Sequence, residues 1–253
     1  MGIRSVFRGW LEQVLAEFGY GLRILGAPPR GYREFLRLYR SAAPLPQTVF
    51  DIGVGEGTPW LYEAFPESRF VLVEPLKEFE SHIQDICRKY VAEAHYCCLG
   101  AAEGETEFEV RPWDLMGSGL PLGRKGDAGA GNGLAGRATE MRRIPVRTLD
   151  SLARGRPLPS IIKIDVEGSE LDVLRGGVQT VRAADLILLE TSLAGRLMIA
   201  PDLIDVGAWL KTQGFQLFDI LEIATRGQNR IPCYVDVAFL RADSESYKRL
   251  AGV

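Results

Sequence analysis

Three glycines that alternate with single residues form the most distinctive short segment of the chain. The first of them, Gly53, lies two residues after Asp51 and is followed by Gly55 and Gly57, directly after an apolar run typical of a strand. Glycines at the turn from a strand into a helix allow backbone conformations closed to other residues and let a ligand approach the main chain. Glu74 ends the next apolar run, where a carboxylate accepts hydrogen bonds from ribose hydroxyls. Together these residues predict a site for an adenosine-containing cofactor.

The spacing of the glycines distinguishes two classes of cofactor. A dinucleotide-binding turn has the pattern G-x-G-x-x-G, whereas here Gly57 stands two places after Gly55. The Asp51 carboxylate would also repel a pyrophosphate and attract a cationic sulfonium that carries an ammonium group. The turn therefore favours S-adenosylmethionine over a nicotinamide cofactor. Two alternatives stay open: a NAD-dependent oxidoreductase, and a non-catalytic module that binds an adenosyl cofactor.

A second group of acidic residues follows later apolar runs. Asp165 and Glu167 come directly after such a run, and Glu190 ends another. Open α/β sheets bind ligands beyond the carboxyl ends of their strands, so Asp51, Glu74, Asp165 and Glu190 are expected to share one cleft. Several acids around one cleft favour a cationic ligand.

Short apolar runs alternate with helical stretches along most of the chain, which predicts an α/β fold with a parallel sheet. Strands are predicted at 49–52, 70–73, 94–99, 106–110, 144–149, 161–165, 185–190, 215–223 and 234–240. Helices are predicted at 58–65, 76–90, 170–175 and 206–213. No long helix separates the last two strands, so they are expected to form an antiparallel hairpin at one edge.

Two segments differ from this alternation. Residues 1–46 have apolar residues at helical spacing with a break at Ala27-Pro28-Pro29, which predicts a helical N-terminal cap before a domain of residues 47–253. Within that domain, eight glycines among residues 117–136 are incompatible with regular structure. We expect this insertion to be a loop that reaches over the cleft.

Composition and charge exclude several functional classes. Hydrophobic residues make up 46% of the chain and charged residues 25%, as in a globular protein with a full core. A total of 30 Lys and Arg against 33 Asp and Glu gives a net charge of −3 without a basic block, so no nucleic-acid partner is expected. The four cysteines lack zinc-type spacing, and charged residues interrupt the apolar runs at the N-terminus. These patterns predict a cytoplasmic protein without membrane insertion.

Four segments resemble the FkbM-type methyltransferases, a family of class I S-adenosylmethionine-dependent enzymes. They are 49–57, 73–75, 147–152 and 162–170, the last followed by Leu174-Arg175-Gly176-Gly177. The resemblance implies a Rossmann-like class I methyltransferase sheet of seven strands, and O-methylation of a hydroxyl on a sugar, polyketide or related small metabolite. The expected partner is a small-molecule or glycosylated acceptor, and a homo-oligomer stays open.

The resemblance also implies roles for individual residues. Glu74 would bind the ribose of the cofactor, Cys98 and Leu99 would lie along its adenine, and Asp165 would lie beside the transferable methyl group. The full set of expected cofactor-binding residues is Asp51, Gly53, Val54, Gly55, Glu74, Pro75, Cys98, Leu99 and Asp165. An alcohol acceptor needs a base for its proton, for which Asp165 is the first candidate, Glu190 the second and Glu167 the third. Two acids fall short of an oxygen cage, so no metal site is predicted.

Overall fold

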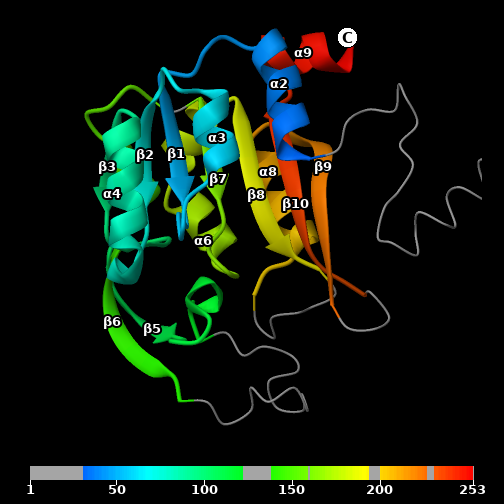
Figure 1. Ribbon diagram of the computed structural model, residues 1–253. Helices are drawn as coiled ribbons and strands as arrows, with labels where there is room; N and C mark the ends of the chain where they lie inside the picture. Colours follow the sequence, from blue (N-terminus) through cyan, green and yellow to red (C-terminus); the bar gives the residue numbers. More distant parts are fainter. Residues whose placement is uncertain (1–30, 122–137, 159, 194–199, 227–230, 253) are drawn as a thin grey trace, which may run out of the picture.

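A central sheet with helices on both faces forms the body of the protein (Figure 1). The computed structural model describes residues 31–121, 138–158, 160–193, 200–226 and 231–252. Seven strands pair in the order β3-β2-β1-β7-β8-β10-β9. Their bounds are β1 Thr48–Ile52, β2 Arg69–Val73, β3 Ala92–His95, β7 Ile161–Ile164, β8 Leu186–Ser192, β9 Phe215–Arg226 and β10 Ile231–Arg241.

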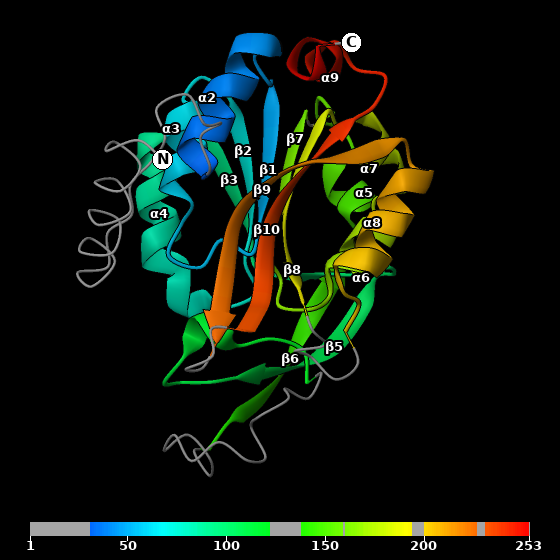
Figure 2. The ribbon, with the colours of Figure 1, turned by 90° about the vertical axis from the view of Figure 1, so that its right-hand side faces the viewer.

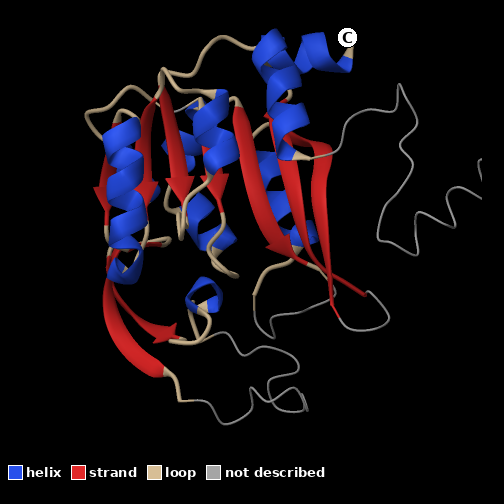
Figure 3. Ribbon diagram, in the orientation of Figure 1, coloured by secondary structure: helices blue, strands red, loops and turns tan. Residues whose placement is uncertain are grey.

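The pairing of the strands confirms the predicted fold class. Strands β3, β2, β1, β7 and β8 run parallel to one another, whereas β10 is antiparallel to both β8 and β9. The expected hairpin is therefore present, and Figure 3 shows β9 and β10 side by side at one edge. From β1 the chain adds strands toward β3, and from β7 it adds strands toward the opposite edge. In such sheets the reversal point, here between β1 and β7, is where ligands bind.

Helices cover the two faces of the sheet as separate layers (Figure 2). One layer holds α2 Tyr32–Ala42, α3 Pro59–Ala64 and α4 Glu80–Lys89, which follows the short 3-10 helix η1 Lys77–Phe79. The other holds α5 Leu149–Ala153, α6 Glu170–Arg175, α7 Val178–Ala183 and α8 Leu203–Thr212, while α9 Glu245–Ala251 contacts α2. Because both faces are covered, β1 and β7 are buried along their whole length, which explains their continuous apolar runs.

A smaller sheet lies beyond the carboxyl ends of the central strands. It consists of β4 Cys98–Leu99, β5 Gly104–Val110 and β6 Glu140–Arg147 in the order β4-β6-β5, with the 3-10 helix η2 Leu115–Gly117 after β5. The prediction of a single strand at 94–99 is wrong, because β3 ends at His95 and β4 pairs with β6 instead. An apolar run does not reveal that two parts of it pair with different partners.

The strand predicted at 144–149 ends earlier than expected, because Thr148 begins a helix. The strand expected at 144–149 ends at Arg147, because the Thr148 side chain accepts a hydrogen bond from the amide of Ser151 and begins α5. Such N-capping competes with the extended conformation.

The second helix of the predicted cap is confirmed as α2. Phe35, Leu36 and Tyr39 are buried, and the helix contacts α3, α9 and β9. The first predicted helix lies within residues 1–30 and most of the glycine-rich insertion within residues 122–137, both outside the described residues. The division at residues 46 and 47 thus stays a prediction. None of the helices in the described part of the chain is long and apolar enough to cross a bilayer.

Candidate active site

The turn after β1 is shaped by two glycines. Gly53 and Gly55 have φ angles of 77° and 53°, which residues with side chains rarely adopt. A Cβ atom on Gly53 would lie 1.7 Å from the carbonyl oxygen of Asp165, and one on Gly55 would lie 2.6 Å from the sulfur of Met116. Both positions favour glycine by their backbone angle, and Gly53 also requires it for space, because its neighbour is backbone whereas the Met116 side chain beside Gly55 can move.

Glu74 connects the turn after β1 to the segment after β2. Its Oε2 accepts a hydrogen bond from the amide of Gly55, and its Oε1 accepts one from the amide of Leu76, both at 2.9 Å. Burial raises the pKa of Glu74, while these two amides act in the opposite direction. Each carboxylate oxygen has a second lone pair, so Glu74 can still accept hydrogen bonds from two ribose hydroxyls.

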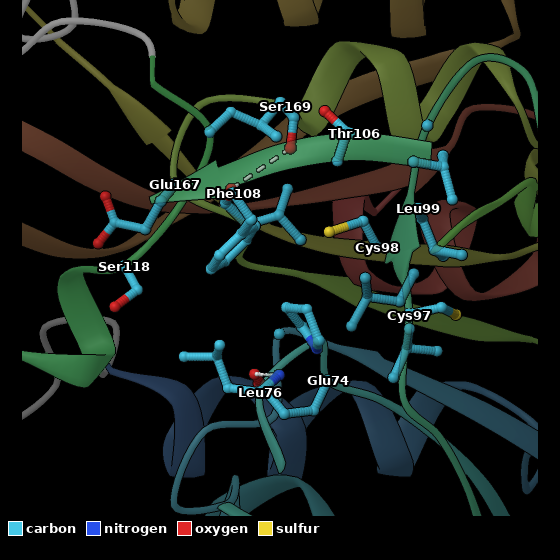
Figure 4. A pocket seen from close by; sticks show the side chains of 18 of the residues that line it. Glu74, Leu76, Cys97, Cys98, Leu99, Thr106, Phe108, Ser118, Glu167 and Ser169 are labelled. Atoms are coloured by element: carbon cyan, nitrogen blue, oxygen red, sulfur yellow. Dashed lines mark hydrogen bonds between the residues drawn. The ribbon is translucent and has the colours of Figure 1, made fainter. Parts of the chain in front are cut away.

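These residues line a cavity between the central sheet and the small sheet. The wall on one side contains Glu74 and Leu76, and the opposite wall contains Thr106 and Phe108 of β5 (Figure 4). Of the predicted cofactor-binding residues, seven line it: Gly53, Gly55, Glu74, Pro75, Cys98, Leu99 and Asp165. A mostly apolar cavity with one buried carboxylate fits an adenosine group, because the walls accept the base while Glu74 accepts from the ribose.

Asp51 and Val54 are not among the lining residues. Val54 is buried in the core. Asp51 is fully buried, accepts a hydrogen bond from the hydroxyl of Tyr62, and has its Oδ1 3.2 Å from Nζ of Lys163. Its charge is therefore already paired within the protein, and its contact with a cofactor stays a prediction.

Lys163 is a residue of this region to which the sequence pattern assigned no role. It lies in β7 directly beside Asp51, and its Nζ is 3.5 Å from Oδ2 of Asp165. A single lysine inside the apolar run of a buried strand was the signal, because a buried ammonium group needs carboxylate partners.

The predicted catalytic acids lie in two different environments. Asp165 lines the cavity with its side chain about one-third exposed. Glu190 does not line it, and lies in β8 opposite Asp236 of β10. Burial, with the charges of Asp165 and Asp236, raises the pKa of Glu190 to about 9. Glu190 is therefore protonated at neutral pH. Of these two acids, only Asp165 lines the cavity.

Two further residues near these acids were not identified from the sequence. Burial raises the pKa of Asp236 to about 6, and a hydrogen bond from Tyr32 acts against that rise. Tyr32 begins α2 and stacks on Trp60 with ring centroids 3.9 Å apart. A residue of the cap helix thus contacts a carboxylate beside Glu190, which only the packing of α2 on the sheet could reveal.

Glu167, the third predicted base, has an unusual backbone conformation. Its φ of 56° makes it the one non-glycine residue with positive φ in the described ranges. Its Oε2 accepts a hydrogen bond from the hydroxyl of Tyr234 at 3.2 Å, and it lines the cavity near Ser118 (Figure 4). Strained conformations of this kind cluster at functional sites, and this one lies in the wall of the cavity.

The two adjacent cysteines line the cavity as thiols. Burial raises the pKa of Cys97 to about 11 and that of Cys98 to about 12, so both are protonated at neutral pH. They act as apolar wall rather than as nucleophiles. No group of three or more acids, histidines and cysteines suited to a metal ion occurs in the part of the chain that the structure describes.

One protein-family model matches the sequence of this chain. The model of the methyltransferase FkbM domain matches residues 51–217. That range begins at Asp51 and includes the glycine turn, Glu74, Lys163, Asp165 and Glu190. No match is found among curated proteins.

Several solved structures resemble the chain at low identity. Methyltransferase FkbM from Methylobacillus flagellatus KT is 18% identical with a TM-score of 0.48; the match covers 76% of this chain but only 43% of that protein. Precorrin-6y C5,15-methyltransferase from Geobacter metallireducens GS-15 is 13% identical with a TM-score of 0.41, covering 83% of this chain and 87% of that one. The O-methyltransferase TomG from Streptomyces achromogenes, in complex with S-adenosylmethionine, is 14% identical with a TM-score of 0.42. The match covers 92% of this chain and 88% of that one.

Proposed function

The chain belongs to the FkbM methyltransferase family and uses S-adenosylmethionine, and from this premise we propose that it methylates a hydroxyl oxygen of a sugar, polyketide or related small metabolite. The observation that carries the proposal is a cavity lined by both Glu74, which follows β2, and Asp165, which follows β7, on opposite sides of the glycine turn after β1. One carboxylate serves the cofactor and the other is left for the acceptor.

The cofactor end of the proposed site is built from backbone and one carboxylate. Gly53 and Gly55 leave two positions of the turn without side chains, and Glu74 supplies the acceptor for ribose hydroxyls. Cys98 and Leu99 provide an apolar wall for adenine. When bound, S-adenosylmethionine supplies an electrophilic methyl group.

Asp165 is the proposed base that removes the proton of the acceptor hydroxyl. It lines the cavity, whereas Glu190 lies outside its lining and holds its proton at neutral pH. A protonated Glu190 cannot accept a proton, but it can donate a hydrogen bond that orients the acceptor or Asp165. Asp165 is thus the catalytic residue and Glu190 a positioning residue in this proposal.

Two measurements test the proposal. Isothermal titration calorimetry with S-adenosylmethionine, S-adenosylhomocysteine and NAD checks the cofactor, and only the adenosyl ligands are expected to bind. A panel of hydroxylated sugars, macrolactones and phenols is then incubated with labelled S-adenosylmethionine, and the products are analysed by mass spectrometry for an O-methyl group.

The variant Asp165→Asn separates catalysis from binding. It is expected to lower the rate of methyl transfer by about 100-fold or more, the range of general-base catalysis, with little change in affinity for S-adenosylmethionine. An unchanged rate would remove Asp165 from this role. Tight cofactor binding without methylation of any acceptor would instead support a non-catalytic module.

A further inference from the structure

Lys163 makes more contacts than a buried counter-ion needs. Its side chain is only 9% exposed, and its Nζ lies 3.2 Å from Oδ1 of Asp51 and 3.5 Å from Oδ2 of Asp165. Burial by itself lowers the pKa of Lys163, but the two carboxylates outweigh burial and the net direction is upward. The ammonium group is therefore charged, and the two acids already compensate its charge.

The shortest contact of Lys163 is to a neutral group. Its Nζ donates a hydrogen bond to the carbonyl oxygen of Gly53 at 2.6 Å. Charge compensation does not require this bond. It ties the side chain in β7 to the glycine turn after β1, at the point where the turn begins to line the cavity.

Gly53 and Asp165 form adjacent parts of the cavity wall. The amide of Asp165 donates to the carbonyl of Ile52 at 3.0 Å, and the missing side chain of Gly53 lets the two backbones touch. Lys163 contacts the carbonyl of the one residue and the carboxylate of the other. Its ammonium group thus connects the end of β1 to the end of β7.

We propose that Lys163 is a positioning residue for cofactor binding, which holds the Gly53 carbonyl and the Asp165 carboxylate in fixed relation where S-adenosylmethionine binds. The inference rests on the proposed function, because it assumes that the cofactor occupies this cavity. Groups that position reactants contribute by holding geometry, and small displacements are costly.

The test compares two variants that both lack the charge of Asp51. Asp51→Asn leaves Lys163 with its contacts to Gly53 and Asp165, whereas Asp51→Asn with Lys163→Met removes both contacts without leaving Asp51 charged and unpaired. Circular dichroism and thermal unfolding check that each variant is folded. Calorimetry then measures the affinity of each for S-adenosylmethionine.

We expect the double variant to bind S-adenosylmethionine about tenfold more weakly than Asp51→Asn, because the Gly53 carbonyl and the Asp165 carboxylate are no longer held in place where the cofactor binds. A role confined to neutralising Asp51 predicts equal affinities, and that result would overturn the inference. If the double variant does not fold, Asp51→Asn with Lys163→Gln replaces it. Glutamine is shorter than lysine and cannot reach both groups, so the same loss is expected and equal affinity again overturns the inference.

Binding to the unaltered chain separates the two proposals. If the unaltered chain does not bind S-adenosylmethionine, the proposed function fails, and the role of Lys163 fails with it. If the unaltered chain binds and the two variants bind equally, only the role of Lys163 fails.

Discussion

Gly53 and Asp165 are in such close contact that a Cβ atom on Gly53 would lie 1.7 Å from the carbonyl oxygen of Asp165. The contact joins the turn after β1 to the end of β7, at the point where the strand order of the sheet reverses. It brings the glycine turn and the proposed catalytic carboxylate into one cavity wall.

Gly53→Ala is expected to destabilise the fold by about 3 kcal/mol or more and to abolish binding of S-adenosylmethionine, because the methyl group would clash with the backbone of Asp165. Gly155→Ala is the matched control, since Gly155 has the same φ of 77° but nothing within 4 Å of its added Cβ. The control carries only the backbone penalty, about 1–2 kcal/mol. Denaturant unfolding and calorimetry measure both effects, and equal losses in the two variants would rule out the clash.

Glu74→Gln is expected to weaken binding of S-adenosylmethionine by about 10- to 100-fold. The amides of Gly55 and Leu76 each donate to a different oxygen of Glu74, and glutamine offers only one oxygen, which leaves one buried amide unpaired. Asp172→Asn removes another carboxylate from the lining of the same cavity, but an exposed one paired with Arg175. Calorimetry on both variants should show a loss only for Glu74→Gln; a similar loss for Asp172→Asn would point to the overall charge of the cavity.

The pH dependence of stability should reveal the proton on Glu190. Its pKa is raised from 4.5 to about 9 in the folded protein, so the folded state binds this proton more tightly than the unfolded chain does. This contribution to stability is complete below about pH 4.5 and is lost as the pH rises toward 9. Glu190→Gln is always neutral and should therefore be more stable than the unaltered chain at pH 8, by roughly 3–5 kcal/mol, because each pH unit between the two pKa values costs about 1.4 kcal/mol.

Thermal unfolding measured from about pH 5 to about pH 9 tests this difference, because that window covers most of the interval between the unfolded and folded pKa values of Glu190. The unaltered chain is expected to lose stability steadily across it, and Glu190→Gln to lose less. Glu105→Gln, at an exposed position of β5, serves as the control and should follow the unaltered chain. Parallel curves for Glu190→Gln and the unaltered chain would show that Glu190 is ionised in the folded protein.

Asp150 belongs to a segment that carries the family resemblance, yet its contacts are structural. Its Oδ1 accepts from the amide and the hydroxyl of Thr180 at 2.8 and 2.6 Å, and its Oδ2 accepts from the amide of Gln179 at 3.2 Å. These amides lie in the first turn of α7, so Asp150 caps that helix from α5. Asp150→Ala should cost about 1–3 kcal/mol of unfolding free energy without changing cofactor affinity.

The exposed pair of Asp85 with Arg88 on α4 provides a comparison for that variant. Asp85→Ala should change the unfolding free energy by less than about 1 kcal/mol, as is usual for exposed ion pairs. A selective loss of cofactor affinity in Asp150→Ala would place Asp150 in the binding site instead.

The sequence predicted the parts of the site that depend on local chain geometry. Glycines alternating at a strand end, an acid at the end of the next strand and a buried strand ending in Asp165 each have one physical interpretation in an open parallel sheet. For that reason Gly53, Gly55, Glu74 and Asp165 could be placed together beforehand, and the structure lines one cavity with all four.

What remained undetermined depended on pairing between distant segments. The run at 94–99 divides between two sheets because Cys98 and Leu99 pair with β6, which begins more than forty residues later, at Glu140. The charge on Asp51 looked available to a cofactor, but β1 and β7 lie in register and place Lys163 beside it. Spacing along the chain carries no information about such partners.

The sequence by itself thus determined the fold class, the glycine turn and the family, because strand periodicity, turn chemistry and motif order are local properties of the chain. Only the tertiary structure decided which acids are available for chemistry. Asp51 is paired with Lys163, Glu190 is half-buried beside Asp236 and holds a proton, and Asp165 alone of the three lines the cavity. The state of a carboxyl group depends on its burial and on the charges around it, which are set by strand register and packing.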